Sequence, residues 1–179
     1  MHLSVRKALF LDRDGTLIKS FEQNGIPHPP TSISEVEPLP GVEKALRIFK
    51  SIGFTPVVIT NQPDVFRESK NIQNVIDINN MVLKIFNLSH IYTCFHDDIH
   101  KCKCRKPKPG LLHMAARDLN ISLNKSLMVG DRWRDIQAGQ SVGCECYFID
   151  HGYREQEPVS PYTRVRSLLD VAEMKKGAV

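Results

Sequence analysis

The sequence lacks several features that would place it in a specialised class of protein. No apolar run approaches the ~20 residues that cross a bilayer, which excludes a helical membrane span. The first residues, MHLSVRKALFLDRD, reach charged side chains too soon for a secretory signal. Internal repeats and low-complexity segments are also missing. We therefore expect a soluble, cytoplasmic protein without a membrane partner.

The sequence also has little excess charge of one sign. Its formal net charge is +4, and lysine and arginine are dispersed except in KCKCRKPK at residues 101–108. This mild excess suits anionic metabolites and does not demand nucleic acid. The chain has 179 residues, of which 41% are hydrophobic and 25% charged. These values predict one globular domain over residues 1–179, and we expect it to be a monomer.

Short apolar runs alternate with helical patterns along the chain. The runs predict strands at residues 7–12, 54–61, 90–95, 126–131 and 145–150. Apolar side chains at helical spacing predict helices at residues 42–51, 72–86, 109–119 and 134–143, with a weaker one at 166–174. This alternation predicts an α/β fold, a Rossmann-like parallel sheet with helices on both faces.

Carboxylates follow two of the predicted strands. Asp12 and Asp14 lie just past the first strand, and Asp131 and Asp135 follow the fourth. Ligands of parallel α/β sheets bind at the carboxyl ends of the strands. Four carboxylates there would repel one another unless a cation or a basic side chain neutralises them. Their hard oxygens suit Mg²⁺, and a carboxylate can also attack phosphorus to form an acyl phosphate.

Groups that can bind phosphate lie near two other predicted strand ends. Thr60, Asn61 and Gln62 offer a hydroxyl, two amides and free backbone N–H groups. Lys106 directly precedes a predicted helix and can balance both carboxylates and phosphate. Neither signal is specific by itself, because each is also common in ordinary turns.

The cysteines are unevenly distributed and odd in number. Four of the five lie between residues 94 and 144. Without a secretory signal, this favours metal ligation over disulfides. The spacing Cys-x-His-x₅-Cys-x-Cys, formed by Cys94, His96, Cys102 and Cys104, supplies the donors of a closed tetrahedral Zn²⁺ site. Such a site is structural, so we assign it no part in a reaction.

Three further residues bear on this zinc hypothesis. His100 lies inside the same loop, about residues 94–104, and is a competing ligand. Cys144 and Cys146 fall on the last predicted strand, where we expect them in the core. We assign no chemistry to residues 151–179.

Taken in order, four motifs resemble those of the haloacid-dehalogenase superfamily of phosphatases. They are DRDGT at residues 12–16, TNQ at 60–62, Lys106 and GDRWRD at 130–135. Within that superfamily, CFHDDIHKCKCRKPKPG resembles the zinc loop of the D,D-heptose 1,7-bisphosphate and histidinol-phosphate phosphatases. The resemblance covers residues 7–150, which is most of the chain.

The resemblance implies roles for individual residues. Asp12 is the expected nucleophile and Asp14 the expected general acid and base. Mg²⁺ is expected on Asp12, the backbone carbonyl of Asp14 and Asp131, with Asp135 supporting the site. His96 fits the zinc-loop pattern better than His100. The residues expected to contact the substrate are Thr60, Asn61, Gln62, Arg105, Lys106 and Arg132.

The chain departs from the family pattern near the substrate. After TNQ, the stretch PDVFRE at 63–68 replaces small residues such as SGIARG. Arg67 is kept, whereas Phe66 and Glu68 are bulkier or charged. Arg132 replaces a common lysine. These changes concern substrate recognition and leave the residues of phosphoryl transfer in place.

The expected activity is therefore a Mg²⁺-dependent phosphomonoesterase of carbohydrate metabolism, with D-glycero-D-manno-heptose 1,7-bisphosphate losing its 7-phosphate. A histidinol-phosphate phosphatase would share every catalytic residue and stays open. A non-enzymatic zinc module that binds nucleic acid is the other alternative, although the strand-end carboxylates would repel a phosphate backbone unless metallated. No large cap fits in the chain, so a Pro-rich flap at about 21–40 and the zinc loop form the expected rim.

Overall fold

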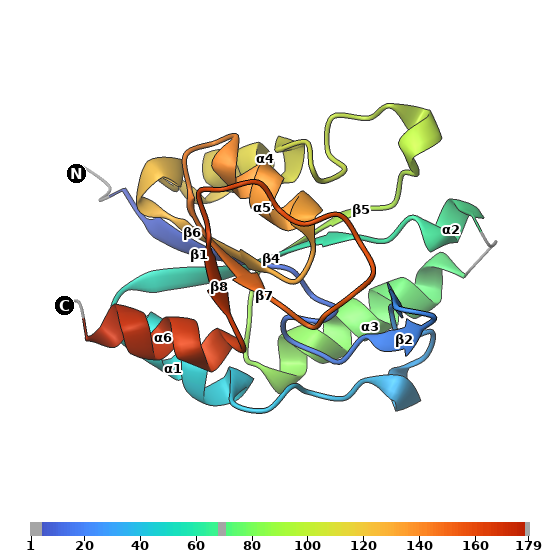
Figure 1. The fold of residues 1–179 in the computed structure, drawn as a ribbon, viewed down its shortest axis with the longest axis horizontal. Helices are drawn as coiled ribbons and strands as arrows, with labels where there is room; N and C mark the ends of the chain where they lie inside the picture. Colours follow the sequence, from blue (N-terminus) through green and yellow to red (C-terminus); the bar gives the residue numbers. More distant parts are fainter. Residues whose placement is uncertain (1–4, 68–70, 178–179) are drawn as a thin grey trace.

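The computed structural model describes residues 5–67 and 71–177 (Figure 1). Its strands are β1 (Lys7–Leu11), β2 (Phe21–Gln23), β3 (Ile26–His28), β4 (Phe54–Asn61), β5 (Ile91–Cys94), β6 (Leu127–Gly130), β7 (Glu145–Ile149) and β8 (Thr163–Val165). Its α-helices are α1 (Val42–Ser51), α2 (Asp64–Arg67), α3 (Ile72–Ile85), α4 (Gly110–Leu119), α5 (Trp133–Gln140) and α6 (Leu168–Lys176). Short 3-10 turns occupy Ile33–Glu35, Asp98–His100 and Leu123–Lys125.

One parallel sheet organises the chain. Its strand order is β5-β4-β1-β6-β7-β8, and each neighbouring pair runs parallel. Leu11 at the end of β1 pairs with Val58 of β4 and Val129 of β6, so these three strands end at the same edge. The chain reverses its direction across the sheet next to β1, where such sheets bind ligands. The predicted Rossmann-like fold is confirmed, and β8 is an edge strand that the sequence analysis missed.

Helices cover both faces of the sheet, as predicted. Figure 1 shows α1 and α6 on one side of the sheet and α4 and α5 on the other. Alternate residues of β1 enter the two cores, because successive side chains of a strand point to opposite faces. Leu9 and Leu11 pack in the core that α1, α3 and α6 complete. Ala8 and Phe10 pack in the core with α4 and α5.

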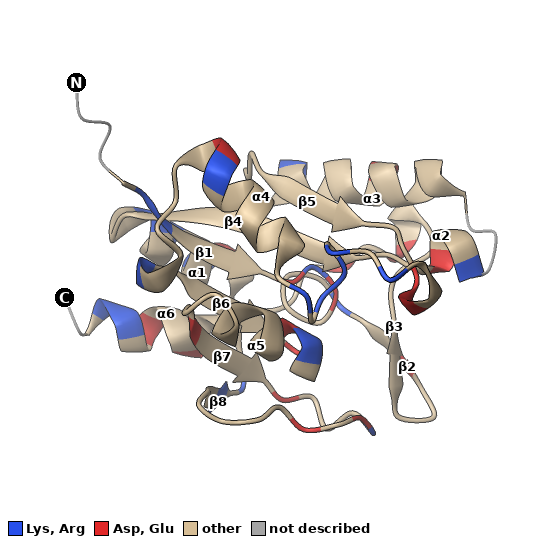
Figure 2. Ribbon diagram, turned by 90° about the horizontal axis from the view of Figure 1, so that it is seen from above, with Lys and Arg blue, Asp and Glu red and all other residues tan. Residues whose placement is uncertain are grey.

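The expected Pro-rich flap contains two short strands that the sequence analysis did not predict. Strands β2 and β3 form an antiparallel hairpin that pairs Phe21 with His28. Asn24 and Gly25 connect them with φ angles of 55° and 82°, the positive values that a two-residue hairpin turn requires. The Asn-Gly pair was therefore the sequence signal that the prediction overlooked. In Figure 2 the hairpin projects from the rest of the fold.

The short segments around the sheet agree with the absence of a large cap. Between β1 and α1 the chain forms the hairpin and one 3-10 turn, and between β4 and α3 the described residues form only α2. Helix α2 was not predicted, and Glu68, which follows it, lies outside the described residues. No helix in the described ranges has the length and apolar character of a membrane span.

Candidate active site

Three carboxylates from two strand ends and one helix converge at the edge where β1 and β6 end. Asp12 follows β1, Asp131 follows β6 and Asp135 lies in the first turn of α5. One oxygen of each lies within 4.8 Å of the other two. All three residues are at most 9% exposed. The structure thus brings together three of the four carboxylates that the sequence placed at strand ends.

Two glycines allow this close packing. A Cβ atom on Gly15 would lie 1.9 Å from Oδ2 of Asp131, and the residue has a φ of +79°. A Cβ atom on Gly130 would lie 2.3 Å from Oδ2 of Asp135. Both distances are far below van der Waals contact. Any side chain at residue 15 or 130 would therefore displace the neighbouring carboxylate, so both positions require glycine.

The electrostatics of this cluster call for a cation. Burial raises the pKa of Asp131 well above its ordinary value, and the charges of Asp12 and Asp135 raise it further. Neither carboxylate oxygen of Asp131 has a hydrogen-bond partner in the described part of the chain. Burial also raises the pKa of Asp135 to about 6, although Lys106 acts to lower it. A buried, unpartnered carboxylate beside two others fits a divalent cation with hard-oxygen preference, such as Mg²⁺.

Lys106 supplies one positive charge to the same cluster. Its Nζ lies 2.8 Å from Oδ1 of Asp12, 2.7 Å from Oδ1 of Asp135 and 2.6 Å from the carbonyl oxygen of Ile59. Burial acts to lower the pKa of Lys106, but the two carboxylates outweigh it and hold that pKa above its ordinary value. One ammonium beside three carboxylates still leaves excess negative charge, which again favours a metal ion.

The fourth predicted carboxylate lies outside this cluster. The side chain of Asp14 accepts hydrogen bonds from Arg13 and from Nε2 of Gln62, the latter at 2.7 Å. Its backbone carbonyl is the part that the sequence analysis assigned to Mg²⁺, so the position of the carboxylate does not conflict with that expectation. Asp14 lines the cavity above the cluster.

The residues of the TNQ motif have different surroundings. Asn61 forms two hydrogen bonds of 3.1 Å with the backbone of Lys106, one donated by its Nδ2 and one accepted by its Oδ1. Gln62 donates to Oγ1 of Thr60 at 2.9 Å as well as to Asp14. Asn61 lines the cavity, whereas Thr60 and Gln62 are buried and do not. The side chains of this motif therefore hold other site residues in place.

A cavity of about 250 Å³ opens over the carboxylates, and five basic side chains line it together with five aspartates. The hairpin contributes residues 26–28 to its wall. Four guanidinium groups also line it, those of Arg67, Arg105, Arg132 and Arg134. A small molecule with more than one anionic group matches this combination of a metal-binding acidic cluster and surrounding arginines.

Asp98 of the zinc loop contacts three of these arginines. Its Oδ1 lies 2.8 Å from Nε of Arg105 and 3.4 Å from Nη1 of Arg134, and its Oδ2 lies 3.4 Å from Nη2 of Arg67. Arg67 also pairs with Asp97. Arg105 is only 8% exposed, so it is a fixed side chain and not a solvated surface charge. Asp64 also lines the cavity and its charge acts on Arg67, so three carboxylates lie among these three guanidinium groups.

The four predicted zinc ligands lie together. The sulfur of Cys104 is 3.3 Å from that of Cys94 and 3.4 Å from that of Cys102, and Cys94 and Cys102 are 3.8 Å apart. Nδ1 of His96 lies 3.3 Å from the sulfur of Cys104 and 3.6 Å from that of Cys94. Tetrahedral Zn²⁺ places sulfurs about 3.8 Å apart and sulfur about 3.6 Å from nitrogen, given its usual bond lengths. The donors therefore fit zinc.

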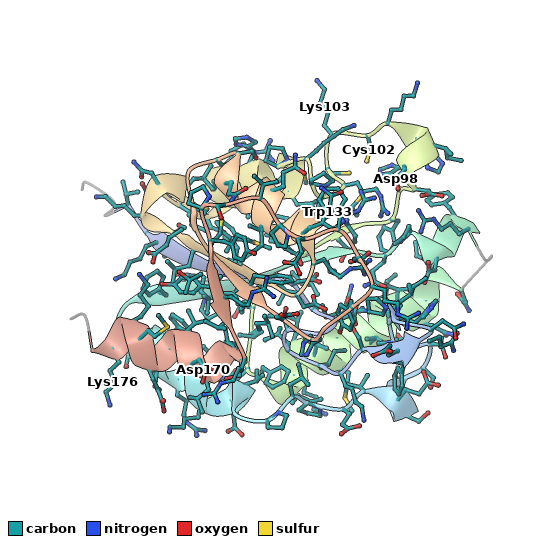
Figure 3. The ribbon with its side chains drawn as sticks, viewed as in Figure 1. Asp98, Cys102, Lys103, Trp133, Asp170 and Lys176 are labelled. Carbon is teal, nitrogen blue, oxygen red and sulfur yellow. The ribbon has the colours of Figure 1, made fainter. Side chains whose placement is uncertain are left out.

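His100, Cys144 and Cys146 lie outside this cluster. His100 is not part of the four-residue group, and its Nδ1 accepts a hydrogen bond of 3.0 Å from the backbone N–H of Asp97. Cys144 and Cys146 are buried in the core with α4 and α5, as predicted. Figure 3 shows Cys102 and Asp98 on the loop that follows β5, which connects the thiolate cluster with the arginine contacts.

The segment after β7 takes part in the site, although the sequence analysis assigned it no chemistry. Nε2 of His151 lies 2.7 Å from the carbonyl oxygen of Gly15. Burial raises the pKa of Tyr153, and the nearby charge of Asp131 adds to this effect. Glu155 pairs with both Nε and Nη2 of Arg132. The signal was available, because these residues follow the carboxyl end of a predicted strand, as the recognised motifs do.

Comparisons with known proteins agree with this geometry. Residues 31–143, more than half of the chain, match the family described as haloacid dehalogenase-like hydrolase. The chain is 35% identical over 149 residues to the D-glycero-beta-D-manno-heptose-1,7-bisphosphate 7-phosphatase of Pasteurella multocida, covering 77% of this chain and 78% of that protein. It is 28% identical to the D-glycero-alpha-D-manno-heptose-1,7-bisphosphate 7-phosphatase of Photorhabdus laumondii, with 94% and 96% of the two chains covered.

A solved structure gives the same result for the fold. The D,D-heptose 1,7-bisphosphate phosphatase from B. bronchiseptica, complexed with magnesium and phosphate, superposes with a TM-score of 0.83 at 25% sequence identity. The match covers 97% of this chain and 99% of the other.

Proposed function

Because the chain belongs to the haloacid dehalogenase-like hydrolase family, we propose that it is a Mg²⁺-dependent phosphatase of a heptose 1,7-bisphosphate and removes the 7-phosphate. One observation carries this proposal. The Asp12, Asp131 and Asp135 cluster, with Lys106 bonded to it, lies at the base of a cavity whose other charged groups are mainly arginines. Phosphoryl transfer needs this combination of a nucleophile, a metal site and basic groups.

The nucleophile is Asp12. An oxygen of its carboxylate forms a bond to phosphorus while the bond from phosphorus to the sugar oxygen breaks, and Asp14 donates a proton to the departing oxygen. Water then attacks the aspartyl phosphate, passes a proton to Asp14 and releases phosphate, which regenerates Asp12. Lys106 stays bonded to Asp12 and orients the carboxylate for attack. This sequence of steps balances protons, since Asp14 gives one and receives one.

The metal assignment rests on the donor set. Asp12, Asp131 and the backbone carbonyl of Asp14 would hold Mg²⁺, with Asp135 beside them. When bound, Mg²⁺ offsets the negative charge of the carboxylates and the phosphoryl oxygens. The unpartnered oxygens of Asp131 support this assignment. We assign Zn²⁺ separately to Cys94, His96, Cys102 and Cys104, where four protein ligands leave no position for substrate.

The substrate class follows from the charge around the cavity. Arg67, Arg105 and Arg134 place guanidinium donors on one side of the cavity, where a second phosphate of the substrate can use them in exchange for their contacts with Asp97 and Asp98. Histidinol phosphate has one phosphate and carries an amine that is positively charged at neutral pH. The relatives that the chain matches are named for the sugar bisphosphate, which favours that substrate over this alternative. A nucleic-acid-binding module would leave the buried carboxylate cluster without a role.

The proposal is tested by phosphate release across a matched panel with Mg²⁺ present. The panel contains the alpha and beta anomers of D-glycero-D-manno-heptose 1,7-bisphosphate, the heptose 7-phosphate, the heptose 1-phosphate and histidinol phosphate. We expect the highest kcat/KM for one bisphosphate anomer, with phosphorus NMR showing that the anomeric phosphate remains. A preference for histidinol phosphate, or no release from any member, would contradict the proposal. The cytoplasmic location, the single domain and the monomeric state stay predictions.

A further inference from the structure

Arg13 belongs to the DRDGT motif but has none of the roles that the family resemblance implies. Its side chain is fully buried, with 0% exposure, and it is not among the residues that line the cavity. Its guanidinium donates from Nε to Oδ1 of Asp14 at 2.9 Å and from Nη2 to Oδ2 of Asp14 at 2.9 Å. The third contact runs from Nη1 to Oδ1 of Asn79 at 2.7 Å.

Burial of a guanidinium group is expensive unless its charge is paired and its donors are used. The forked contact with Asp14 provides both, because two parallel N–H groups match the two oxygens of a carboxylate. Lysine could not reproduce this geometry, since its ammonium has one nitrogen and cannot donate to both carboxylate oxygens in parallel. The two parallel hydrogen bonds therefore fix the orientation of the Asp14 carboxylate, and the guanidinium also neutralises its charge.

The other end of Arg13 is fixed by elements far away in the sequence. Asn79 lies on α3 and is itself buried, and its Nδ2 donates to Oγ1 of Thr93 on β5 at 3.1 Å. The guanidinium is thus held between α3 and the turn after β1. On the opposite side of Asp14, Gln62 donates to Oδ2 and is held by Thr60 of β4.

The two oxygens of Asp14 are not equivalent in this network. Oδ2 accepts from both Arg13 and Gln62, whereas Oδ1 accepts from Arg13 alone. A carboxylate oxygen has two acceptor positions, so Oδ2 is fully used and Oδ1 keeps one. We propose that Arg13 is a positioning residue that aims the Asp14 carboxylate so that Oδ1 is the atom that exchanges the proton. This inference rests on the proposed function, in which Asp14 serves the leaving oxygen and then water.

The proposed role differs from that of an ordinary buried ion pair in its effect on individual steps. If Arg13 only stabilised the fold, its loss would slow the turnover of every substrate by the same factor. If it positions Asp14, its loss slows the first step selectively for esters whose leaving group needs a proton. A sugar alkoxide needs that proton, whereas p-nitrophenolate is stable enough to leave without it.

The test measures the first turnover with enzyme in excess and Mg²⁺ present, for wild type, Arg13→Lys and Asp14→Asn. Release of heptose 1-phosphate from the heptose 1,7-bisphosphate is compared with release of p-nitrophenol from p-nitrophenyl phosphate. We expect Arg13→Lys to slow heptose 1-phosphate release by about 10²-fold, the usual contribution of general acid catalysis, and p-nitrophenol release far less. Arg117→Lys, a surface arginine paired with Asp118, is the matched control and should change neither rate.

Each outcome separates the two proposals. Equal losses on both substrates in Arg13→Lys, with selective loss in Asp14→Asn, would overturn the positioning role and leave the proposed function standing. The absence of selective loss in Asp14→Asn would contradict the role of Asp14 in the proposed function itself. If Arg13→Lys does not fold, Asn79→Ala keeps the fork on Asp14 and removes the distant contact of the guanidinium, together with the hydrogen bond to Thr93. The same selective loss is expected at a smaller size.

Discussion

The ammonium group of Lys106 lies 2.8 Å from Oδ1 of Asp12, although 94 residues separate the two in the sequence. Asn61 holds the backbone of Lys106 through two hydrogen bonds, which links β4 to this contact. Asp12 and Lys106 both have little contact with solvent. The pair is therefore a buried charge contact in which each partner depends on the other.

We expect Lys106→Met to lower the free energy of unfolding by about 3–5 kcal/mol in EDTA, because it leaves buried carboxylates without their ammonium partner. Activity should also be lost, since the Asp12 carboxylate loses the group that orients it. Urea unfolding and phosphate release measure the two effects. Lys103→Met is the matched control, because Lys103 is exposed and extends from the zinc loop in Figure 3. Equal stability of the two variants would contradict the role of the buried pair.

The stability of the metal-free protein should fall as the pH rises from about 4 to about 6. Asp135 has a pKa of about 6 in the folded chain against an ordinary value of 3.8. The folded state therefore binds more protons than the unfolded state in this window, so raising the pH favours unfolding. The contribution of Asp135 is lost by about pH 6, and Asp131, whose pKa burial raises well above its ordinary value, adds to the same trend. A bound cation offsets this cost.

Mg²⁺ should accordingly raise the urea midpoint more at about pH 7 than at about pH 5, because the carboxylates bind metal only when ionised. Unfolding curves at both pH values, with Mg²⁺ and with EDTA, measure this difference. Asp135→Asn removes one of the two carboxyl groups with a raised pKa and should make the pH dependence in EDTA shallower between about pH 4 and 6. A metal-free stability that increases between pH 4 and 6 would show that the sign is wrong.

The purified protein should carry about one Zn²⁺ per chain. Cys102→Ser or Cys104→Ser should lose the metal and destabilise the loop that also places Asp98 and Arg105. Elemental analysis of protein prepared without chelators measures the metal content. Cys144→Ser is the matched control, since this buried cysteine lies outside the cluster. Full zinc content in the Cys104→Ser protein would rule out the assigned ligand set.

Arg105→Ala should lower kcat/KM for the bisphosphate by about 1.5–3 kcal/mol, the usual size of a charged hydrogen bond. A small ester such as p-nitrophenyl phosphate has no second phosphate and should be nearly unaffected. Lys101→Ala tests a nearby exposed charge of the same loop and should affect neither substrate. Zinc content is measured in parallel, so that damage to the loop is detected. Similar losses on both substrates would mean that Arg105 serves the transferred phosphate or the fold.

Local sequence patterns were sufficient for the sheet and for the carboxylate cluster. Short apolar runs that stop at charged residues identify buried parallel strands, and the strand-end rule then brings Asp12 and Asp131 together. Helix α1 was predictable for a similar reason, since Val42, Ala45, Leu46 and Phe49 share one buried face. These features depend on neighbours in sequence and on one general rule of topology.

Contacts between distant segments were not predictable in this way. Strand β8 has three residues and pairs only at the sheet edge, so its sequence carries no strand pattern. The strand-end rule places residues 151–155 near the site, but it does not give the partners: His151 contacts Gly15 and Glu155 pairs with Arg132 because the chain returns across the site. The same holds for Arg13, whose partner Asn79 lies 66 residues away on α3.

The central chemical claim is that Asp12 accepts the phosphoryl group, and trapping that intermediate tests it most directly. In Asp14→Asn the leaving p-nitrophenolate needs no proton, whereas water attack on the aspartyl phosphate loses its base and slows. We predict that this variant, mixed with p-nitrophenyl phosphate and Mg²⁺ and quenched in acid, carries one phosphate on the peptide containing Asp12. The double variant Asp12→Asn, Asp14→Asn should carry none and release no p-nitrophenol. Release of p-nitrophenol from Asp14→Asn without phosphate on Asp12 would contradict the account.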